Sequence, residues 1–187
     1  MRLSIYELAE QHNILAGSAL GRRLLAALIA ATPSANVPEP VFLDFSGVEI
    51  ATSSFLRESV IGFRDFARSS LQNIYPVVAN AAPAVIEELE FFARHRGDVL
   101  WCCVLNEEGA VSNARIIGEL DPAQRATFDT VAHLGEATAP ELAAQSGGNS
   151  IGPTAWNNRL SALAAKGLLV ERRGGKTKSF SPLLETA

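Results

Sequence analysis

The chain has very few of the residues that bind metals or form disulfides. Among its 187 residues are two adjacent cysteines and three scattered histidines: Cys102, Cys103, His12, His95 and His133. Adjacent residues of a strand point to opposite faces, so the two thiols would make a poor disulfide and a poor metal clamp. We therefore expect two buried cysteines on a strand, and neither a metal site nor a cofactor.

Long hydrophobic runs are also lacking. A membrane-spanning helix needs roughly 18 or more apolar residues, whereas the apolar segment Leu24–Ala31 is much shorter. A signal peptide would place its basic residues nearer Met1 than Arg22 and Arg23, and its apolar stretch earlier. The sequence therefore predicts a cytoplasmic protein with no membrane partner.

Local catalytic signatures are missing too: there is no nucleophile elbow, no His-Glu-x-x-His motif and no dinucleotide-binding glycine pattern. Residues Gly174–Thr177 are similar to the end of a phosphate-binding loop. That motif requires a glycine where Val170 stands, and a helix after it where we expect a strand. The carboxylates Glu87, Glu88 and Glu90 are explained by the solvated face of a helix. We therefore do not expect an enzyme.

Charge is unevenly distributed along the chain. The net charge of −4 argues against indiscriminate nucleic-acid binding. Residues 1–120 hold nine basic and 14 acidic side chains, whereas residues 142–187 hold six basic and two acidic ones. This asymmetry indicates a local site for a polyanion near the C-terminus.

The first 120 residues alternate segments typical of strands with segments typical of helices. The hydrophobic patterns predict strands at 3–8, 41–45, 74–78, 98–105 and 110–117, and helices at 16–31, 53–68 and 85–94. Asn106–Gly109 is expected to be the hairpin loop between the last two strands. The alternation favours an α/β layer with a partly parallel sheet.

Helix-start signals mark a boundary near residue 120. Asp121–Gln124 combines an N-cap aspartate, a proline at the first helical position and a glutamine three residues after the cap. Thr138–Glu141 has the same form, and a third helix is expected from Pro153 to the C-terminal cap glycine Gly167. The sequence therefore predicts two domains, residues 1–118 and 121–187.

The third helix is followed by a strand, the basic loop Arg172–Lys178, and a second strand. Residues Pro153–Leu169 resemble the recognition helix and the start of the wing in MarR-like and ArsR-like bacterial regulators. Those families combine a polar helix, a Leu-x-x-Leu stripe, a Lys-Gly-Leu turn and a basic wing. The resemblance covers about residues 121–183 and implies a winged helix-turn-helix domain of the α+β class.

Helical periodicity separates a core face from a polar face on this third helix. Trp156, Leu160 and Leu163 are expected to pack against Leu134, Leu142 and Leu168. The residues predicted to contact DNA are Thr154, Asn157, Asn158 and Arg159 on the helix, and Arg172, Arg173, Lys176 and Lys178 on the hairpin. Two other interpretations stay open: a solvated helix with an ordinary charged hairpin, and a winged helix that docks proteins.

The most informative stretch of the first domain is Val41–Glu58, in which a strand, a connector and the helix start Thr52-Ser53-Ser54 follow one another. It resembles the STAS domains of anti-anti-sigma factors, and more closely the STAS-like family of uncharacterised function. In anti-anti-sigma factors the second serine of this turn is phosphorylated, and Ser54 falls on it, with Ser53 before it. Thr52, Phe55 and Arg57 replace the acid and the two glycines of that motif. Alternatively, Thr52 or Ser53 caps the helix.

These features predict an α/β, STAS-like N-terminal domain with a mixed sheet and helices, joined to a C-terminal winged helix-turn-helix. We expect a bacterial transcription regulator that binds duplex DNA through the winged helix and senses or docks something through the STAS-like domain. The alternative is a partner-switching signalling protein that binds a kinase or an ATPase and no DNA. A weaker third hypothesis is binding of a small ligand or nucleotide by the first domain. Whether the protein forms a homodimer stays open.

Overall fold

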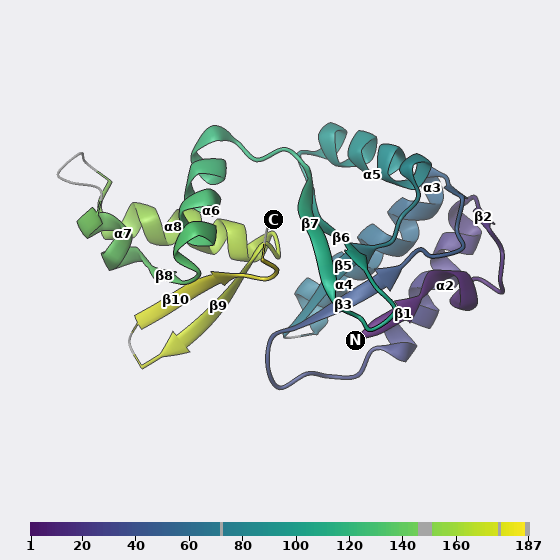
Figure 1. Cartoon of the computed structure of the whole chain (residues 1–187), viewed down its shortest axis with the longest axis horizontal. Coiled ribbons are helices and arrows are strands. Elements are labelled where there is room, and N and C mark those ends of the chain that lie inside the picture. The colour runs from purple at the N-terminus through teal and green to yellow at the C-terminus, as the bar shows by residue number, and fades with distance from the viewer. Residues whose placement is uncertain (72, 146–150, 176, 186–187) are drawn as a thin grey trace. The chain divides into compact units, whose positions relative to one another are not determined.

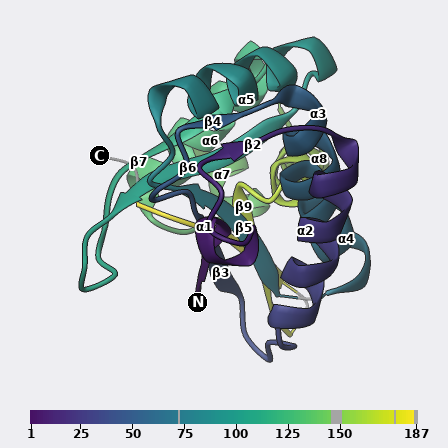
Figure 2. The same cartoon turned by 90° about the vertical axis from the view of Figure 1, so that its right-hand side faces the viewer.

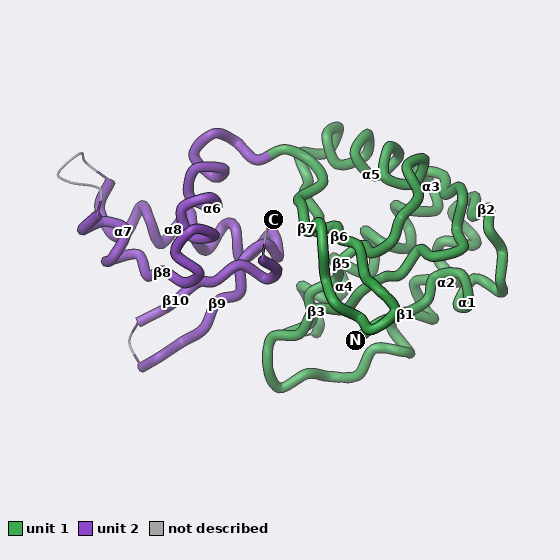
Figure 3. Tube along the Cα trace, viewed as in Figure 1, with its two compact units in different colours: residues 1–119, 187 green, residues 120–186 purple. Residues whose placement is uncertain are grey.

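The computed structural model describes residues 1–71, 73–145, 151–175 and 177–185 (Figure 1). The chain divides into two compact units, residues 1–119 and residues 120–186 (Figure 3). Helices and strands occur in both, so this is a mixed α/β protein. Within the described ranges, no helix is long and apolar enough to cross a membrane. That each unit folds by itself stays a prediction.

The first unit contains a five-stranded sheet with the order β1-β3-β5-β6-β7. The first four of these strands run parallel, and β7 is antiparallel to β6. The strands of the first unit are β1 (Arg2–Ser4), β2 (Ile14–Leu15), β3 (Glu39–Asp44), β4 (Ile50–Ala51), β5 (Ile74–Ala79), β6 (Val99–Leu105) and β7 (Val111–Gly118). Strands β2 and β4 form a separate two-stranded sheet. The helices of the first unit are α1 (Ile5–Leu8), α2 (Ser18–Ala31), α3 (Ser53–Leu56), the π-helical turn η1 (Arg57–Ile61), α4 (Gly62–Ser70) and α5 (Pro83–Arg96).

Helices α2, α4 and α5 pack on one face of this sheet, the side that faces the viewer in Figure 2. Alternate strand residues such as Leu43 and Val78 join the core formed with these helices. Side chains alternate along a strand, so the neighbouring residues on each strand, such as Val77 and Trp101, point to the other face. These residues are buried as well. These strands are therefore apolar on both faces.

The helix expected at residues 53–68 is interrupted by the π turn η1. A π turn places one extra residue in the helical path, and here the buried Ser59 hydroxyl donates to the Phe55 carbonyl at 2.7 Å. Helix α2 approaches this turn closely: a Cβ on Gly21 would lie 2.7 Å from the Phe55 carbonyl oxygen and 2.9 Å from the Glu58 Cβ. The packing of α2 on η1 therefore requires glycine at position 21.

The strand predicted at residues 3–8 is wrong in its second half. Strand β1 ends at Ser4, and Ile5–Leu8 forms the short helix α1. The reason is local, because the Ser4 hydroxyl accepts a hydrogen bond from the Glu7 backbone N–H at 3.2 Å and so caps a helical turn. The predicted hairpin is confirmed: β6 and β7 pair around Asn106–Gly109.

The described part of the second unit consists of three helices and a three-stranded antiparallel sheet with the order β8-β10-β9. Its elements are α6 (Pro122–Leu134), β8 (Ala137–Thr138), α7 (Ala139–Gln145), α8 (Pro153–Ala165), β9 (Leu169–Gly174) and β10 (Thr177–Pro182). Its buried residues include Phe128, Leu142, Trp156, Leu160, Leu163, Leu168 and Phe180. The predicted core face of the third helix is therefore confirmed. The expected packing of Leu134 in this core is wrong, because this side chain at the end of α6 is 42% exposed.

Both predicted helix caps of the second unit are confirmed. The Asp121 carboxylate accepts from the Gln124 N–H at 2.8 Å. Thr138 and Glu141 form a reciprocal capping box: the Glu141 carboxylate accepts from the Thr138 N–H at 2.8 Å, and the Thr138 hydroxyl from the Glu141 N–H at 3.4 Å. Gly167 has a φ of +75°, a left-handed conformation that suits glycine after the end of α8.

Replacing Gly21 by alanine tests the close packing of α2 on η1. We expect Gly21→Ala to lower the free energy of unfolding by about 1–3 kcal/mol, because the new methyl group meets backbone atoms. Gly62→Ala is the matched control, since its Cβ would meet the flexible end of Leu25 at 3.2 Å. The control should be neutral, or stabilising by up to about 1 kcal/mol through helix propensity. Equal effects of the two substitutions in urea denaturation would contradict the packing argument.

Candidate functional site

Polar residues gather on one side of α8. Thr154, Asn157, Asn158 and Ser161 are spaced three or four residues apart and therefore share a helical face. Thr154 and Asn158 are exposed, whereas Asn157 and Ser161 are half-buried. The N-cap residue of α8 is Gly152, which has no side chain to accept the first N–H groups of the helix. The start of α8 thus presents hydroxyl, amide and backbone N–H groups.

Arg159, also predicted to contact DNA, already has a partner. Its guanidinium carbon lies 5.5 Å from the centre of the Trp156 ring, which is a cation–π contact. The Trp156 side chain is buried and Arg159 is half-buried. This contact orients Arg159 over the indole, so its positive charge is in part engaged within α8.

The hairpin of β9 and β10 carries its charges on two faces. Arg173 lies opposite Lys178 and Glu171 opposite Phe180, so these four residues share one face of the hairpin. The Glu171 carboxylate lies 2.9 Å from Lys178 Nζ and 3.3 Å from Arg173 Nε. Burial raises the pKa of Glu171, but the hydrogen bonds from Lys178 and Arg173 lower it further, and the net shift is downward. Glu171 therefore stays ionised and neutralises part of the hairpin charge.

The other predicted hairpin residues differ in position. Arg172 points to the opposite face, where its guanidinium donates to the Ser181 hydroxyl at 2.8 Å. Lys176 lies outside the described residues. The sequence analysis did not identify Glu171 as part of this site. Glu171 and Arg173 are two residues apart on one strand, and this spacing indicates that they share a face.

A surface cavity of about 420 Å³ lies where α7, α8 and β10 meet. The residues that line it are Ala139, Pro140, Pro153, Thr154, Asn157, Thr177 and Lys178. The structure thus brings one predicted phosphate contact, Lys178, to the same depression as two predicted base contacts, Thr154 and Asn157. Asn158 and Arg172 are not among the described residues that line it.

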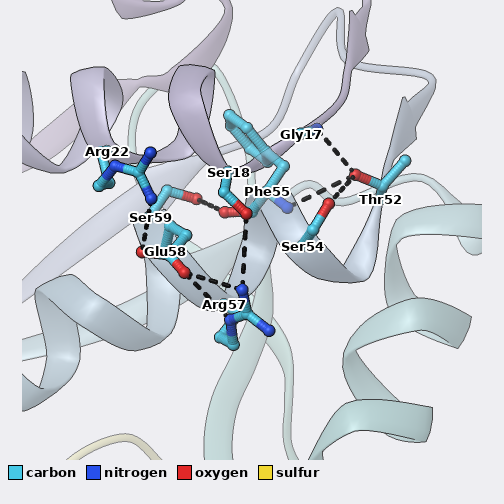
Figure 4. Close-up of polar contacts among 9 residues, drawn as sticks. All are labelled: Gly17, Ser18, Arg22, Thr52, Ser54, Phe55, Arg57, Glu58 and Ser59. Atoms are coloured by element: carbon cyan, nitrogen blue, oxygen red, sulfur yellow. Dashed lines mark hydrogen bonds and ion pairs between the residues drawn. The ribbon is translucent and has the colours of Figure 1, made fainter.

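In the first unit, Thr52 is the N-cap of α3 (Figure 4). Its hydroxyl oxygen accepts from the Phe55 N–H at 3.4 Å and from the Gly17 N–H at 3.2 Å. The Ser54 hydroxyl lies 3.1 Å from that of Thr52, and the Ser53 hydroxyl donates to the Glu88 carboxylate on α5. Both serines are half-buried. The capping interpretation is confirmed for Thr52, and Ser53 and Ser54 open the helix behind it.

Residues that sequence reasoning missed surround this turn (Figure 4). Arg57 reaches the Ser18 hydroxyl at 3.5 Å and the Glu58 carboxylate at 2.9 Å. Arg22 of α2 lies 3.7 Å from the same carboxylate. The starts of α2 and α3 are therefore adjacent, and the Ser18 hydroxyl lies beside Arg57. Ser18 and Arg57 are far apart in the sequence, so no local motif could reveal this pairing.

A buried carboxylate, Asp44, lies at the carboxyl ends of the parallel strands. Its side chain is 3% exposed and lies 2.5 Å from an Arg2 guanidinium nitrogen. The Ser46 N–H and hydroxyl donate to it at 3.0 and 2.8 Å, and the Asn80 amide at 2.9 Å. Burial raises the pKa of Asp44, but these hydrogen bonds outweigh it and hold the pKa below its ordinary value of 3.8. Because its partners come from β1, from the loop after β3 and from the residue after β5, Asp44 links the ends of these strands.

The two cysteines lie on the buried strand β6. Among the residues that the structure describes, no group of three histidine, cysteine or acidic side chains is placed to hold a metal ion. Cys102 and Cys103 are free and buried, as expected. Burial, aided by the neighbouring Cys102, raises the pKa of Cys103 to about 12. At neutral pH this thiol is protonated and therefore unreactive.

Comparisons of the chain with models of protein families, with curated proteins and with solved structures found no match. The resemblances to STAS-like domains and to winged-helix regulators therefore remain predictions. The features from which a function can be argued are the polar start of α8, the charged hairpin beside it, and the turn at Thr52.

The pH dependence of stability tests the role of Asp44. The pKa of Asp44 is lower in the folded protein than its ordinary value of 3.8. Ionised Asp44 therefore stabilises the fold fully at pH values above 3.8, and this stabilisation is lost as the pH falls through the lowered pKa. Asp44→Asn should lower the unfolding free energy at neutral pH by about 1–3 kcal/mol. In acid the two stability curves should converge. Asp129→Asn, which removes a carboxylate that is 60% exposed, is the control. If the unfolding free energies of Asp44→Asn and the parent protein differ by the same amount at every pH, the proposed role of Asp44 is contradicted.

Proposed function

We propose that the chain is a bacterial transcription regulator that acts in the cytoplasm and binds duplex DNA through its second unit, folded as a winged helix. The order α6-β8-α7-α8-β9-β10 supports this proposal, because three helices precede a two-stranded hairpin and β8 pairs with that hairpin. The carrying observation is the convergence of Lys178, Thr154 and Asn157 on one cavity. A cation and polar side chains at one place suit a ligand with phosphates and base edges.

In this proposal the polar face of α8 enters the major groove. Asparagine amides pair in bidentate fashion with adenine there, which makes Asn157 and Asn158 the candidates for reading bases. Lys178 holds a phosphate, and the first N–H groups of α8 add a favourable field for an anion at the same depression. Arg172 and Arg173 extend the phosphate contacts along the hairpin.

Glu171 limits the strength of this binding. It lies between Lys178 and Arg173, so part of the hairpin charge is balanced before any DNA arrives. Phosphate affinity depends on the number of cations that replace counterions. We therefore infer modest electrostatic affinity, with discrimination left to the helix.

The test is binding of the purified full chain to random-sequence duplex fragments across a salt series. Lys178→Ala should weaken binding to all duplexes alike and reduce the slope of log K against log salt by about 1. The double variant Arg172→Ala, Arg173→Ala should reduce it by about 2. Asn157→Ala should instead blur preference at particular base pairs, by about 1–3 kcal/mol for each lost bidentate contact.

Two further variants sharpen this experiment. Glu171→Gln removes the carboxylate between two cations and should tighten binding, whereas Glu136→Gln, at an exposed position of the same unit, should leave it nearly unchanged. Arg125→Ala on α6, with a side chain 45% exposed, controls for general loss of charge. Hairpin variants that bind DNA as tightly as the parent protein would overturn the proposal.

A second candidate function is partner switching through a STAS-like first unit, without DNA. The hydroxyls of Thr52 and Ser54 beside Ser18 and Arg57 favour it. A kinase or an ATPase would then act at Ser54, since the Ser53 hydroxyl is held by Glu88. A phosphate on Ser54 would gain from the helix start and from Arg57 three residues on. In the DNA-binding proposal, the same unit senses a signal or docks a partner.

Ser54→Asp tests this turn. We expect it to change DNA or partner binding while the unfolding free energy stays within about 0.5 kcal/mol, because an acid is favourable in the first turn of a helix. Ser53→Asp is the control: it places a carboxylate against Glu88 and should lower stability. If Ser54→Asp lowers stability and leaves binding unchanged, the residue is structural.

A further inference from the structure

Helix α5 has one buried side and one exposed side. Its buried residues, spaced four positions apart, are Val85, Leu89 and Ala93. Its exposed charged and aromatic residues are Glu87, Phe91, Arg94, His95 and Arg96. Phe91 lies near the middle of the helix and is 56% exposed. The exposed side of α5 therefore carries a large apolar side chain between charged ones.

The Phe91 ring is held in place by contacts within the helix itself. The centres of the Phe91 and His95 rings are 4.1 Å apart. His95 Nδ1 lies 2.8 Å from the Phe91 carbonyl oxygen, which fixes the position of the imidazole. An aromatic side chain that is already ordered loses little conformational entropy when a partner covers it.

The charges on either side of Phe91 are arranged symmetrically in position and oppositely in sign. Two acidic residues, Glu87 and Glu88, precede Phe91 by four and three positions, whereas Arg94 and His95 follow it by three and four. Each pair lies about 5 Å from Phe91 along the helix axis. At 3.6 residues per turn, Glu87 and Arg94 lie on one flank of Phe91, and Glu88 and His95 on the other. A second α5 that runs in the opposite direction therefore presents basic groups to these acids.

We propose that the exposed side of α5 is a self-association surface, on which a second copy of this chain packs its own α5 in the antiparallel direction. A two-fold axis at Phe91 brings the two phenyl rings together. It also places Glu87 beside Arg94 of the second copy, and Glu88 beside the second copy's His95. Symmetry repeats both contacts, which makes the surface complementary to itself. The proposal concerns assembly and does not depend on DNA binding.

Within one copy, Glu87 and Arg94 are available for these contacts. Among the described residues, Glu87 has neither a hydrogen bond nor an ion pair. Arg94 Nε lies 3.5 Å from the Glu119 carboxylate, but these side chains are 63% and 77% exposed. So exposed an ion pair contributes little and is easily rearranged. Glu88 already accepts a hydrogen bond from Ser53, so we expect the contact of Glu87 with Arg94 to contribute more.

The surface is small for a dimer interface. One pair of helices with a single aromatic anchor on each covers less than the roughly 1,600 Å² of a standard interface. We therefore expect a weak and reversible dimer, with a dissociation constant of about 10 µM or weaker. In dilute solution the monomer should predominate.

The experiment is sedimentation of the full chain at low salt, over concentrations from about 1 µM to 1 mM. Phe91→Ser should weaken the dimer about tenfold or more, because two phenyl rings lose their cover. Glu87→Arg and Arg94→Glu should each weaken it about tenfold, because each places like charges opposite one another at two contacts. The matched controls are Val104→Ser, at a side chain 44% exposed, and Glu107→Arg, at an exposed residue. Neither control should change the association.

Exchanging the two charges tests the antiparallel arrangement directly. The double variant Glu87→Arg, Arg94→Glu should associate as strongly as the parent protein. An equimolar mixture of the two single variants should form a mixed dimer that is stronger than either variant with itself, because each reversed charge then faces an opposite one. A surface in which these residues do not meet across a two-fold axis gives no such rescue.

Three results would overturn the self-association surface. They are a chain that stays monomeric up to about 1 mM, a dimer that Phe91→Ser leaves unchanged, and charge reversals that the double variant does not rescue. Duplex binding is measured separately, at chain concentrations at which the monomer predominates. Failure of the dimer and failure of DNA binding are therefore distinguishable.

Discussion

The approach of α2 to the π turn leaves no room for a methyl group between Gly21 and the Phe55 carbonyl. The polar contacts between α2 and the segment Thr52–Glu58 lie at this close approach. With α2 held there, Gly17 lies within reach of the Thr52 hydroxyl, and Arg22 within reach of Glu58. The starts of α2 and α3, with the hydroxyl and arginine groups near them, lie side by side because a glycine allows two backbones to touch.

The two units use the same electrostatic arrangement. Glu58 lies between Arg57 and Arg22, and Glu171 lies between Lys178 and Arg173. In each case one carboxylate orients two cations and weakens their field. Neither surface is therefore a strong non-specific trap for anions, which agrees with an overall net charge of −4.

Local signals predicted a large share of the fold. The caps at Asp121 and Thr138, the buried run at Val41 and the polar side of α8 each depend on residues within a few positions of one another. Features that depend on tertiary contacts were not predictable. At the π turn the Ser59 hydroxyl donates to the Phe55 carbonyl, and Gly21 packs against the turn from another helix. The pairing of Arg57 with Ser18 depends on the fold itself.

The order of strands in the first unit has a consequence for how the protein is made on the ribosome. Strand β3 pairs with β1, β5 with β3, β6 with β5 and β7 with β6, so every new strand joins the one most recently placed in the five-stranded sheet. No strand of this sheet waits for a partner that is synthesised later, apart from β1 itself, which is three residues long. The growing chain can therefore extend its sheet by sequential addition during translation, with each new strand pairing with the open edge of the strand before it.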